Sequence, residues 1–241
     1  MTMRKMIFVL GLVAGLWACE DSSTDDFSFE YEETFHETKI PPGNKFLSIQ
    51  NTNGSIAILG SDTATHLSFE ITKRVRSYRS SMDAKDYIND IQVSFKTNAE
   101  GLQVTTDHPE SKDLDYEVDY KIVAPIIFDY KTVLGNGDIS IEGVSRNLTI
   151  TLGNGNFHGD VILLNDCTVD VEAGNGSIYM IIPKITDASL FATVGNGSIT
   201  DSNLGLSDRV ATGKTLSGIM GEGKGTIILI LGNGTVTLEG Y

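Results

Sequence analysis

The stretch that decides the fold runs from residue 148 to residue 155 and reads Leu-Thr-Ile-Thr-Leu-Gly-Asn-Gly. Its first five residues alternate between apolar and polar β-favouring side chains, which is typical of a half-buried strand. The Gly-Asn-Gly that follows suits a sharp change of direction, because glycine accepts positive φ freely and asparagine tolerates it. We therefore expect a strand that runs into a tight corner.

The same corner recurs through the second half of the chain. The series comprises Asn136-Gly137, Asn154-Gly155, Asn175-Gly176, Asn196-Gly197, Ser217-Gly218 and Asn233-Gly234. The glycines of successive pairs lie 18, 21, 21, 21 and 16 residues apart. β-Rich apolar stretches flank the pairs, and a period of about 20 residues with such flanks indicates a solenoid.

Stacking explains why such a repeat would fold. One coil of this length carries two or three short strands and cannot bury its apolar side chains alone. Coils stacked about 4.8 Å apart pair strand to strand and bury a continuous apolar column. Asparagines at equivalent corners can then hydrogen-bond along the axis as a ladder. A set of β-hairpins is the alternative, because Asn-Gly is also a strong hairpin signal. We favour the solenoid, because hairpins would not need six turns in a common register.

The part of the chain before these corners is also predicted to be β-rich. Period-two alternation of apolar and polar residues recurs between Leu47 and Ile122. One short helix is expected over residues 82–90, with Ser80 or Ser81 as its N-cap.

The layout resembles the bacterial putative-adhesin β-repeat domains, a family of unknown function with many envelope lipoproteins. The resemblance covers residues 44–241 and rests on Asn53-Gly54-Ser55-Ile56, on residues 120–125 and on the series of corners. It implies a right-handed β-helical fold and an adhesin-like role, and it supplies no catalytic residues. The expected fold is thus all-β, with a β-rich part over residues 44–127 and a single-stranded β-helix over residues 128–241.

Residues 1–18 have the features of a lipoprotein signal peptide. Arg4 and Lys5 precede an uncharged, mostly apolar run over residues 6–16, which is too short to cross a bilayer core of about 30 Å as a helix. Leu16-Trp17-Ala18-Cys19 follows and resembles a bacterial lipobox. This implies cleavage before Cys19, a diacylglyceryl group on its sulfur and an outer-membrane lipoprotein that faces the periplasm or the cell surface.

The second cysteine, Cys167, then has no partner within the chain. Because it lies in an apolar β-rich stretch, we expect it to be a small buried hydrophobic residue.

Charge excludes one class of function and predicts a tether. Acidic residues outnumber basic ones 32 to 18, which argues against nucleic-acid binding, because a phosphate backbone needs a positive face. Eight of the acids lie between Glu20 and Glu37 with no lysine or arginine among them. Such a block cannot bury enough apolar surface to fold, so residues 19–43 are predicted to be a lipidated cysteine and an extended acidic tether.

Lys73, Arg74, Arg76 and Arg79 form a basic patch on this acidic chain. One interpretation is a solvated strand face, and the other is a binding patch that docks an anionic glycan or a lipid headgroup.

No motif points to catalysis, a cofactor or a metal. Gly213-Lys214-Thr215 lacks the upstream glycine of a phosphate-binding loop, because Asp208 stands in its place, so nucleotide binding is not expected. Only Asp138 follows a corner in the way that calcium-binding repeats require, and no histidine has metal-ligand spacing. The sequence therefore predicts a non-enzymatic, lipid-anchored protein that binds an envelope glycan or protein, or acts as a scaffold.

Two other interpretations stay open. One is a structural envelope protein without a dedicated ligand. The other is a carbohydrate-active enzyme, such as a polysaccharide lyase or hydrolase, on the same β-helical fold. Its acidic and basic groups would come from Asp166, Asp170, Glu172, Lys184, Asp187, Asp201 and Arg209.

Overall fold

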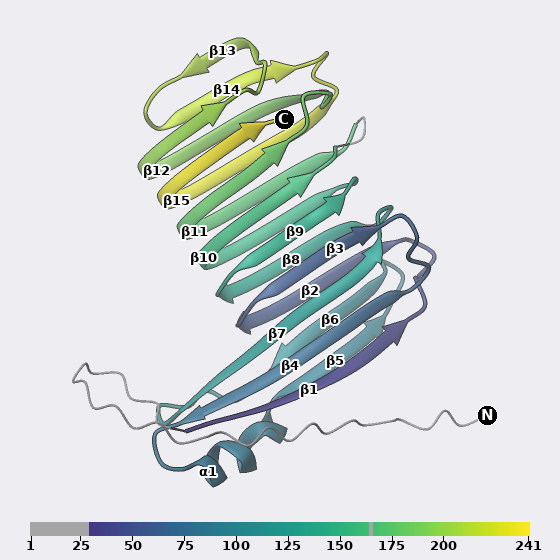
Figure 1. Ribbon diagram of the computed structural model, residues 1–241, viewed down its shortest axis with the longest axis vertical. Helices are drawn as coiled ribbons and strands as arrows, with labels where there is room; N and C mark the ends of the chain where they lie inside the picture. The colour runs from purple at the N-terminus through teal and green to yellow at the C-terminus, as the bar shows by residue number, and fades with distance from the viewer. Residues whose placement is uncertain (1–28, 164–165) are drawn as a thin grey trace.

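The computed structural model describes residues 29–163 and 166–241, and this part of the chain is all-β with one short α-helix (Figure 1). The elements in chain order are β1 (Phe29–Lys39), β2 (Phe46–Asn53), β3 (Ile56–Ser61), β4 (Leu67–Ser77), α1 (Ser81–Asp86), the 3₁₀ helix η1 (Tyr87–Asp90), β5 (Gln92–Thr97), β6 (Leu102–Asp107), β7 (Leu114–Pro125), β8 (Asp129–Asn136), β9 (Ile139–Val144), β10 (Leu148–Val161), β11 (Thr168–Ile182), β12 (Ala188–Ser202), β13 (Ser207–Ala211), β14 (Thr215–Met220) and β15 (Gly225–Gly240).

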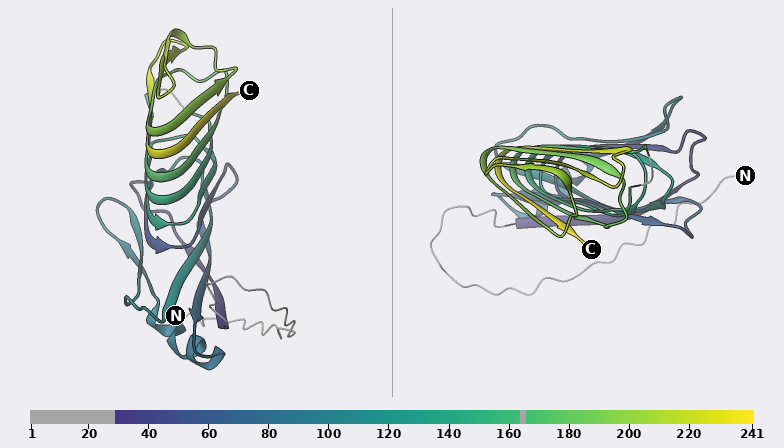
Figure 2. Two further views of the ribbon diagram at one scale, coloured as in Figure 1. Left: turned by 90° about the vertical axis from the view of Figure 1, so that its left-hand side faces the viewer. Right: turned by 90° about the horizontal axis from the view of Figure 1, so that it is seen from above.

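Four long strands, β10, β11, β12 and β15, bend at their Gly-Asn-Gly and continue on the other side of the molecule. Seen from above, they are nested U-shaped arches (Figure 2). Neighbouring arches are parallel and in register, so that Asn154 lies opposite Asn175 and Asn175 lies opposite Asn233. The shorter pairs β8–β9 and β2–β3 continue the same stack on either side of their own corners. The stack therefore includes residues upstream of residue 128.

The bends divide the sheet into two facing layers. We call layer A the strands β1-β4-β7-β3-β9 together with the arch segments that follow the corners. Layer B contains β5, β6, β2 and β8, the arch segments that precede the corners, and β14 and β13. In layer A, β4 is antiparallel to both β1 and β7, whereas the strands from β7 to β12 are parallel.

Apolar side chains from both layers fill the space between them. In β10, Leu148, Ile150 and Leu152 point inward from layer B, and Phe157 and Val161 point inward from layer A. Each of these side chains is at most 2 % exposed. Because every arch repeats this alternation, the buried residues form one continuous core along the stack.

The arches are not stacked in the order of the chain. β15, the last strand, lies between β11 and β12 and pairs in parallel with both (Figure 1). The hairpin formed by β13 and β14 then covers the outer edge of β12 in layer B. A solenoid built coil after coil would have placed β12 directly on β11.

The prediction of a corner at Ser217-Gly218 is wrong. Both residues lie within β14, where Ser217 pairs antiparallel with Phe191 and Gly218 pairs with Leu190. Gly218 lacks a positive φ. A Cβ atom there would lie 3.0 Å from the Cβ of Leu206, so this glycine makes room for a packed side chain instead of a bend.

The acidic tether predicted over residues 19–43 is wrong in part, because residues 29–39 form β1, antiparallel to β4 from Phe29 to Lys39. Glu30 and Glu32 point outward, whereas Tyr31 and Phe35 point inward, pack against the core and hold the strand in place. The signal peptide and Cys19 lie outside the described residues. In the described ranges, no helix has the length and apolar character needed to cross a membrane.

Two local predictions are confirmed. The helix begins after Ser80, whose hydroxyl accepts a hydrogen bond from the Asp83 amide at 3.1 Å. Cys167 is 8 % exposed, and burial raises the pKa of its thiol.

Candidate binding surface

The corner asparagines hydrogen-bond to one another along the stack. Each side-chain amide donates to the side-chain oxygen of its neighbour, at donor–acceptor distances between 2.6 and 2.8 Å. The ladder runs through Asn196, Asn233, Asn175, Asn154, Asn136 and Asn53. At its lower end, Asn53 donates to the carbonyl of Tyr116 in β7, 3.2 Å away. These amides satisfy one another, so the ladder is structural.

The corner glycines permit this close stacking. Gly155 and Gly176 have φ values of +136° and +129°, which residues other than glycine rarely adopt. A Cβ atom on Gly176 would also lie 1.7 Å from the carbonyl oxygen of Gly155. Backbone therefore fills the space between successive corners.

The basic patch is neutralised within the fold. Its strand, β4, lies between the acidic strands β1 and β7. Arg74 forms ion pairs with Glu32 at 3.1 Å, Glu117 at 2.9 Å and Asp119 at 3.3 Å. Burial disfavours the charged form of Arg74, but Glu117, Glu32 and Asp119 outweigh it and raise the pKa of the guanidinium. Arg74 is the centre of a structural ion-pair network.

The other members of the patch are also engaged. Arg76 pairs with Glu30 at 2.9 Å and with Glu117 at 2.8 Å, and Arg79 pairs with Asp113. The Lys73 ammonium donates to the carbonyl of Ile91, 2.7 Å away. The interpretation of this patch as a dock for anionic ligands is therefore wrong, because carboxylates surround its arginines.

Cross-strand rows organise the outer face of layer A. One row runs His36, Glu70, Lys121, Ala57, Ser140, His158, Tyr179, Thr237 and Thr200. The next runs Thr38, Ser68, Val123, Leu59, Glu142, Asp160, Ile181, Glu239 and Ser202. Within residues 29–163 and 166–241, this face carries ten carboxylates, which are Glu30, Glu32, Glu70, Asp115, Glu117, Asp119, Asp138, Glu142, Asp160 and Glu239. The lysine and arginine residues on it in the same ranges are Arg74, Arg76 and Lys121, so this part of the face has a net negative charge.

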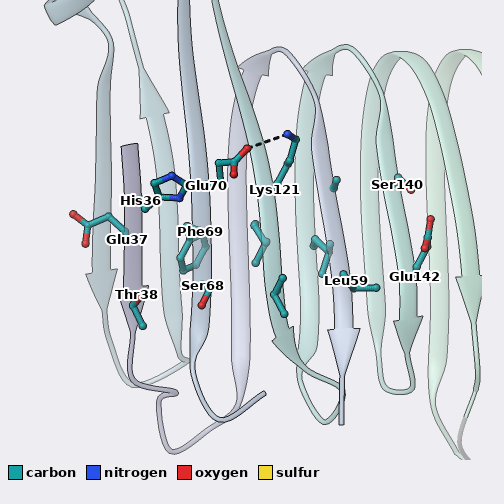
Figure 3. Close-up of a pocket in the computed structure, with 14 residues that line it drawn as sticks. His36, Glu37, Thr38, Leu59, Ser68, Phe69, Glu70, Lys121, Ser140 and Glu142 are labelled. Carbon is teal, nitrogen blue, oxygen red and sulfur yellow. Dashed lines mark hydrogen bonds and ion pairs between the residues drawn. The ribbon is translucent and has the colours of Figure 1, made fainter. Parts of the chain in front are cut away.

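A groove of about 600 Å³ crosses this face where the antiparallel strands meet the arches. Strands β1, β4, β7, β3 and β9 line it. Its centre is apolar, with Ala57, Leu59 and Val123, and Leu59 is 49 % exposed. Figure 3 shows Glu70 and Lys121 on one side of this apolar centre and Glu142 at the opposite end.

The charged groups of the groove are open to solvent. Lys121 donates a hydrogen bond to Glu70 at 2.9 Å, and this contact lowers the pKa of the Glu70 carboxyl. The Lys121 side chain is 74 % exposed, so the pair can exchange partners at little cost. Among the residues that the structure describes, no ion pair involves Glu142, and no group of three or more histidine, cysteine or acidic side chains could hold a metal ion.

The acids considered for an enzyme are spread over the fold. Asp170 and Glu172 project from β11 in layer B. Asp187 accepts hydrogen bonds from the backbone amides of Glu222 and Lys224, at 2.8 and 3.1 Å, and so stabilises a turn. Asp201 and Arg209 form an ion pair at 2.7 Å, and Asp166 and Lys184 lie in the loops after β10 and β11. The structure does not bring these groups together into one cluster.

Sequence reasoning missed the groove. Its apolar centre leaves a signal, because Ile56-Ala57-Ile58-Leu59 and Ile122-Val123 are apolar at consecutive positions where alternation predicts a polar outward residue. The charged residues leave none, because their assembly depends on which strands become neighbours.

Comparison with known proteins places the fold. No family model matches the chain, and no curated protein matches it. A putative cell adhesion protein from Clostridium sporogenes has a similar structure, with a TM-score of 0.55 and 14 % identity over 87 % of this chain and all of that one. A putative adhesin from Bacteroides fragilis matches with a TM-score of 0.31 and 13 % identity over 87 % of this chain and 97 % of that one. The chain is therefore similar in fold to the putative cell adhesion protein from Clostridium sporogenes.

Proposed function

We propose that this chain is a lipid-anchored, non-enzymatic protein of the cell envelope that binds a partner in the manner of an adhesin. The observation that carries the proposal is the outer face of layer A. It is broad, acidic and regular, and an apolar groove opens on it. The similarity in fold to a putative cell adhesion protein supports the same role.

A rigid scaffold suits this role. The asparagine ladder and the closely packed glycines fix each arch against the next. We propose that these arches are the coils of a right-handed β-solenoid in which the last coil is inserted before the one that precedes it in sequence. Because these contacts hold the scaffold in place, its outer face can contact a partner without reorganising.

The lipid anchor would hold this face near a membrane. If Cys19 is acylated, ten Cα–Cα steps separate it from Phe29, the first residue of β1. An extended chain of that length reaches at most roughly 35 Å. The groove would then sample a shell close to the outer membrane, where an envelope glycan or protein is available.

A binding and turnover assay tests the proposal. Full-length protein in detergent would be applied to arrays of envelope polysaccharides and proteins, and the same polysaccharides would be examined for cleavage. We expect saturable binding without cleavage. Absence of binding would refute the adhesin-like role. Cleavage that a single acid-to-alanine change abolishes, with the fold intact, would establish the carbohydrate-active enzyme instead.

A further inference from the structure

We infer that the groove on layer A binds an extended protein segment that carries a cationic side chain on each side of an apolar one. This inference rests on the proposed binding function and names the class of its partner. Three properties of the groove support it: its length, the order of the side chains along it and the sign of its charge.

The groove has the length of a short peptide. It crosses five neighbouring strands, from β1 to β9. Strands in a sheet lie about 4.8 Å apart, so the crossing measures roughly 19 Å. An extended chain rises about 3.3 Å per residue, so about six residues span it.

The order of side chains along the groove is acid, apolar, acid. Glu70 lies on β4, Val123 and Leu59 follow on β7 and β3, and Glu142 lies on β9. Glu142 lies two residues beyond Ser140, the residue of β9 in the row of Glu70. Three strand spacings across (about 14 Å) and two residues along (about 7 Å) therefore put the two backbone positions roughly 16 Å apart. In an extended chain, residues i and i+4 are about 13 Å apart and point to the same side, with residue i+2 between them, and long cationic side chains cover the difference. Cations at i and i+4 and an apolar residue at i+2 therefore match Glu70, the Leu59–Val123 surface and Glu142.

The sign of the charge selects a basic partner. Two carboxylates and one ammonium project into the groove from the outer face, since Glu70 and Glu142 face it together with Lys121. Outside the groove, carboxylates also outnumber cations on the layer A face, and they extend this negative field. The field attracts a basic segment and repels anionic glycans and lipids.

Lys121 does not block this mode of binding. Its contact with Glu70 is exposed, and such contacts are weak. When a partner's cation takes its place on Glu70, Lys121 can turn to Asp119, the adjacent outward residue of the same strand.

Fluorescence anisotropy with labelled peptides tests the inference. The probe is the peptide Gly-Lys-Thr-Leu-Thr-Lys-Gly. One control, Gly-Thr-Lys-Leu-Lys-Thr-Gly, has the same composition with both lysines on the side opposite to leucine. A second control replaces both lysines of the probe with glutamate. We expect the probe to bind the full-length protein at least fivefold more tightly than either control, and we expect added salt to weaken it.

Matched protein variants locate the contact. Glu142→Lys and Leu59→Ser are expected to weaken binding of the probe at least fivefold. Glu172→Lys makes the same charge change and Ile230→Ser a comparable loss of apolar surface at exposed positions of layer B, and both are expected to leave binding unchanged. Circular dichroism melts of all four variants establish that they fold.

The outcomes separate this inference from the proposed function. Equal binding of the probe and the glutamate peptide, or wild-type affinity in a folded Glu142→Lys variant, would overturn the inference. If a partner from the arrays still binds that variant as tightly as wild type, the adhesin-like role stands and the groove is not its site. If the arrays capture nothing, the proposed function itself fails.

Discussion

Replacing Gly176 with alanine tests how the arches are held together. Gly176 lies at the corner of β11, between the arches of β10 and β15. Its φ is +129°, and a Cβ atom would lie 1.7 Å from the carbonyl oxygen of Gly155 and 2.7 Å from its carbon. The methyl group thus meets backbone, which cannot swing aside as a flexible side chain can.

Two costs add at this position. Holding a residue other than glycine in a sparsely populated region of φ/ψ costs about 1–3 kcal/mol. Forcing an extra carbon into well-packed structure costs about 1–3 kcal/mol more. The sum is about 2–6 kcal/mol, a large part of the roughly 5–15 kcal/mol that stabilises an ordinary domain. For a chain of this size, a loss of about 4 kcal/mol lowers the Tm by about 8–16 °C.

Three other glycines separate the two costs. Gly174 has no positive φ, but its Cβ would lie 2.5 Å from the carbonyl oxygen of Gly153. Gly205 has a φ of +67° with open space around it, and Gly213 has neither constraint. We expect Gly176→Ala to be the least stable, Gly174→Ala and Gly205→Ala to be intermediate, and Gly213→Ala to melt close to wild type.

Thermal melts followed by circular dichroism, with urea titrations at 25 °C, measure this order. If Gly176→Ala melts within about 2 °C of Gly213→Ala, the close corner-to-corner contact is not what stabilises the stack, and the reasoning is refuted.

Three further predictions concern the ion pairs and the anchor. Arg74→Met removes the cation that Glu32, Glu117 and Asp119 share and should destabilise the fold by about 1–3 kcal/mol in urea titrations. Arg79→Met, at a side chain that is 65 % exposed, should change the stability by less than about 0.5 kcal/mol. Hydrogen bonding from the backbone amide of Lys224, and contact with its ammonium, lower the pKa of Asp187 below its usual 3.8. The stability that this carboxylate contributes to the fold is therefore present above pH 3.8 and is lost as the pH falls through the lowered pKa. An NMR titration of Asp187 should have its midpoint below 3.8. In Lys224→Met the midpoint should rise only in part, because the backbone donor remains. Cys19→Ala should move the protein from the membrane fraction to the soluble fraction, since acyl chains are what would hold it there; wild type that is soluble without detergent would contradict the lipid anchor.

Local chemistry made five corners predictable. An Asn-Gly pair between β-favouring stretches restricts the backbone at the corner itself, so the sequence around Asn154 suffices to place a bend there. Ser217-Gly218 does not restrict the backbone in this way, because serine and glycine are also compatible with an ordinary strand. Only the contact of Gly218 with Leu206 distinguishes the two cases, and that contact depends on tertiary packing.

The remaining errors come from contacts between distant segments. A block of acids without bases indicates a disordered tether, but Glu30 and Glu32 find their cations on β4, more than 40 residues away. The basic patch was open to misinterpretation for the same reason, because its partners lie on two other strands. The groove depends on the joining of β7 to β3, a pairing that no local pattern encodes.

The position of β15 restricts the order in which the molecule can assemble from a chain that emerges N-terminus first. The arch of β12 emerges before β15, but in the finished fold it pairs with β15 and not with β11, because β15 lies between them. The asparagines that join these arches are 58 and 37 residues apart in sequence. Until β15 has emerged, the native pairings leave a stack that ends in the open edge of β11 and a separate terminal unit of β12, β14 and β13. Closing this long-range gap is slow compared with local pairing, so the exposed edges of β11 and β12 are where a chaperone or a misfolded copy would compete.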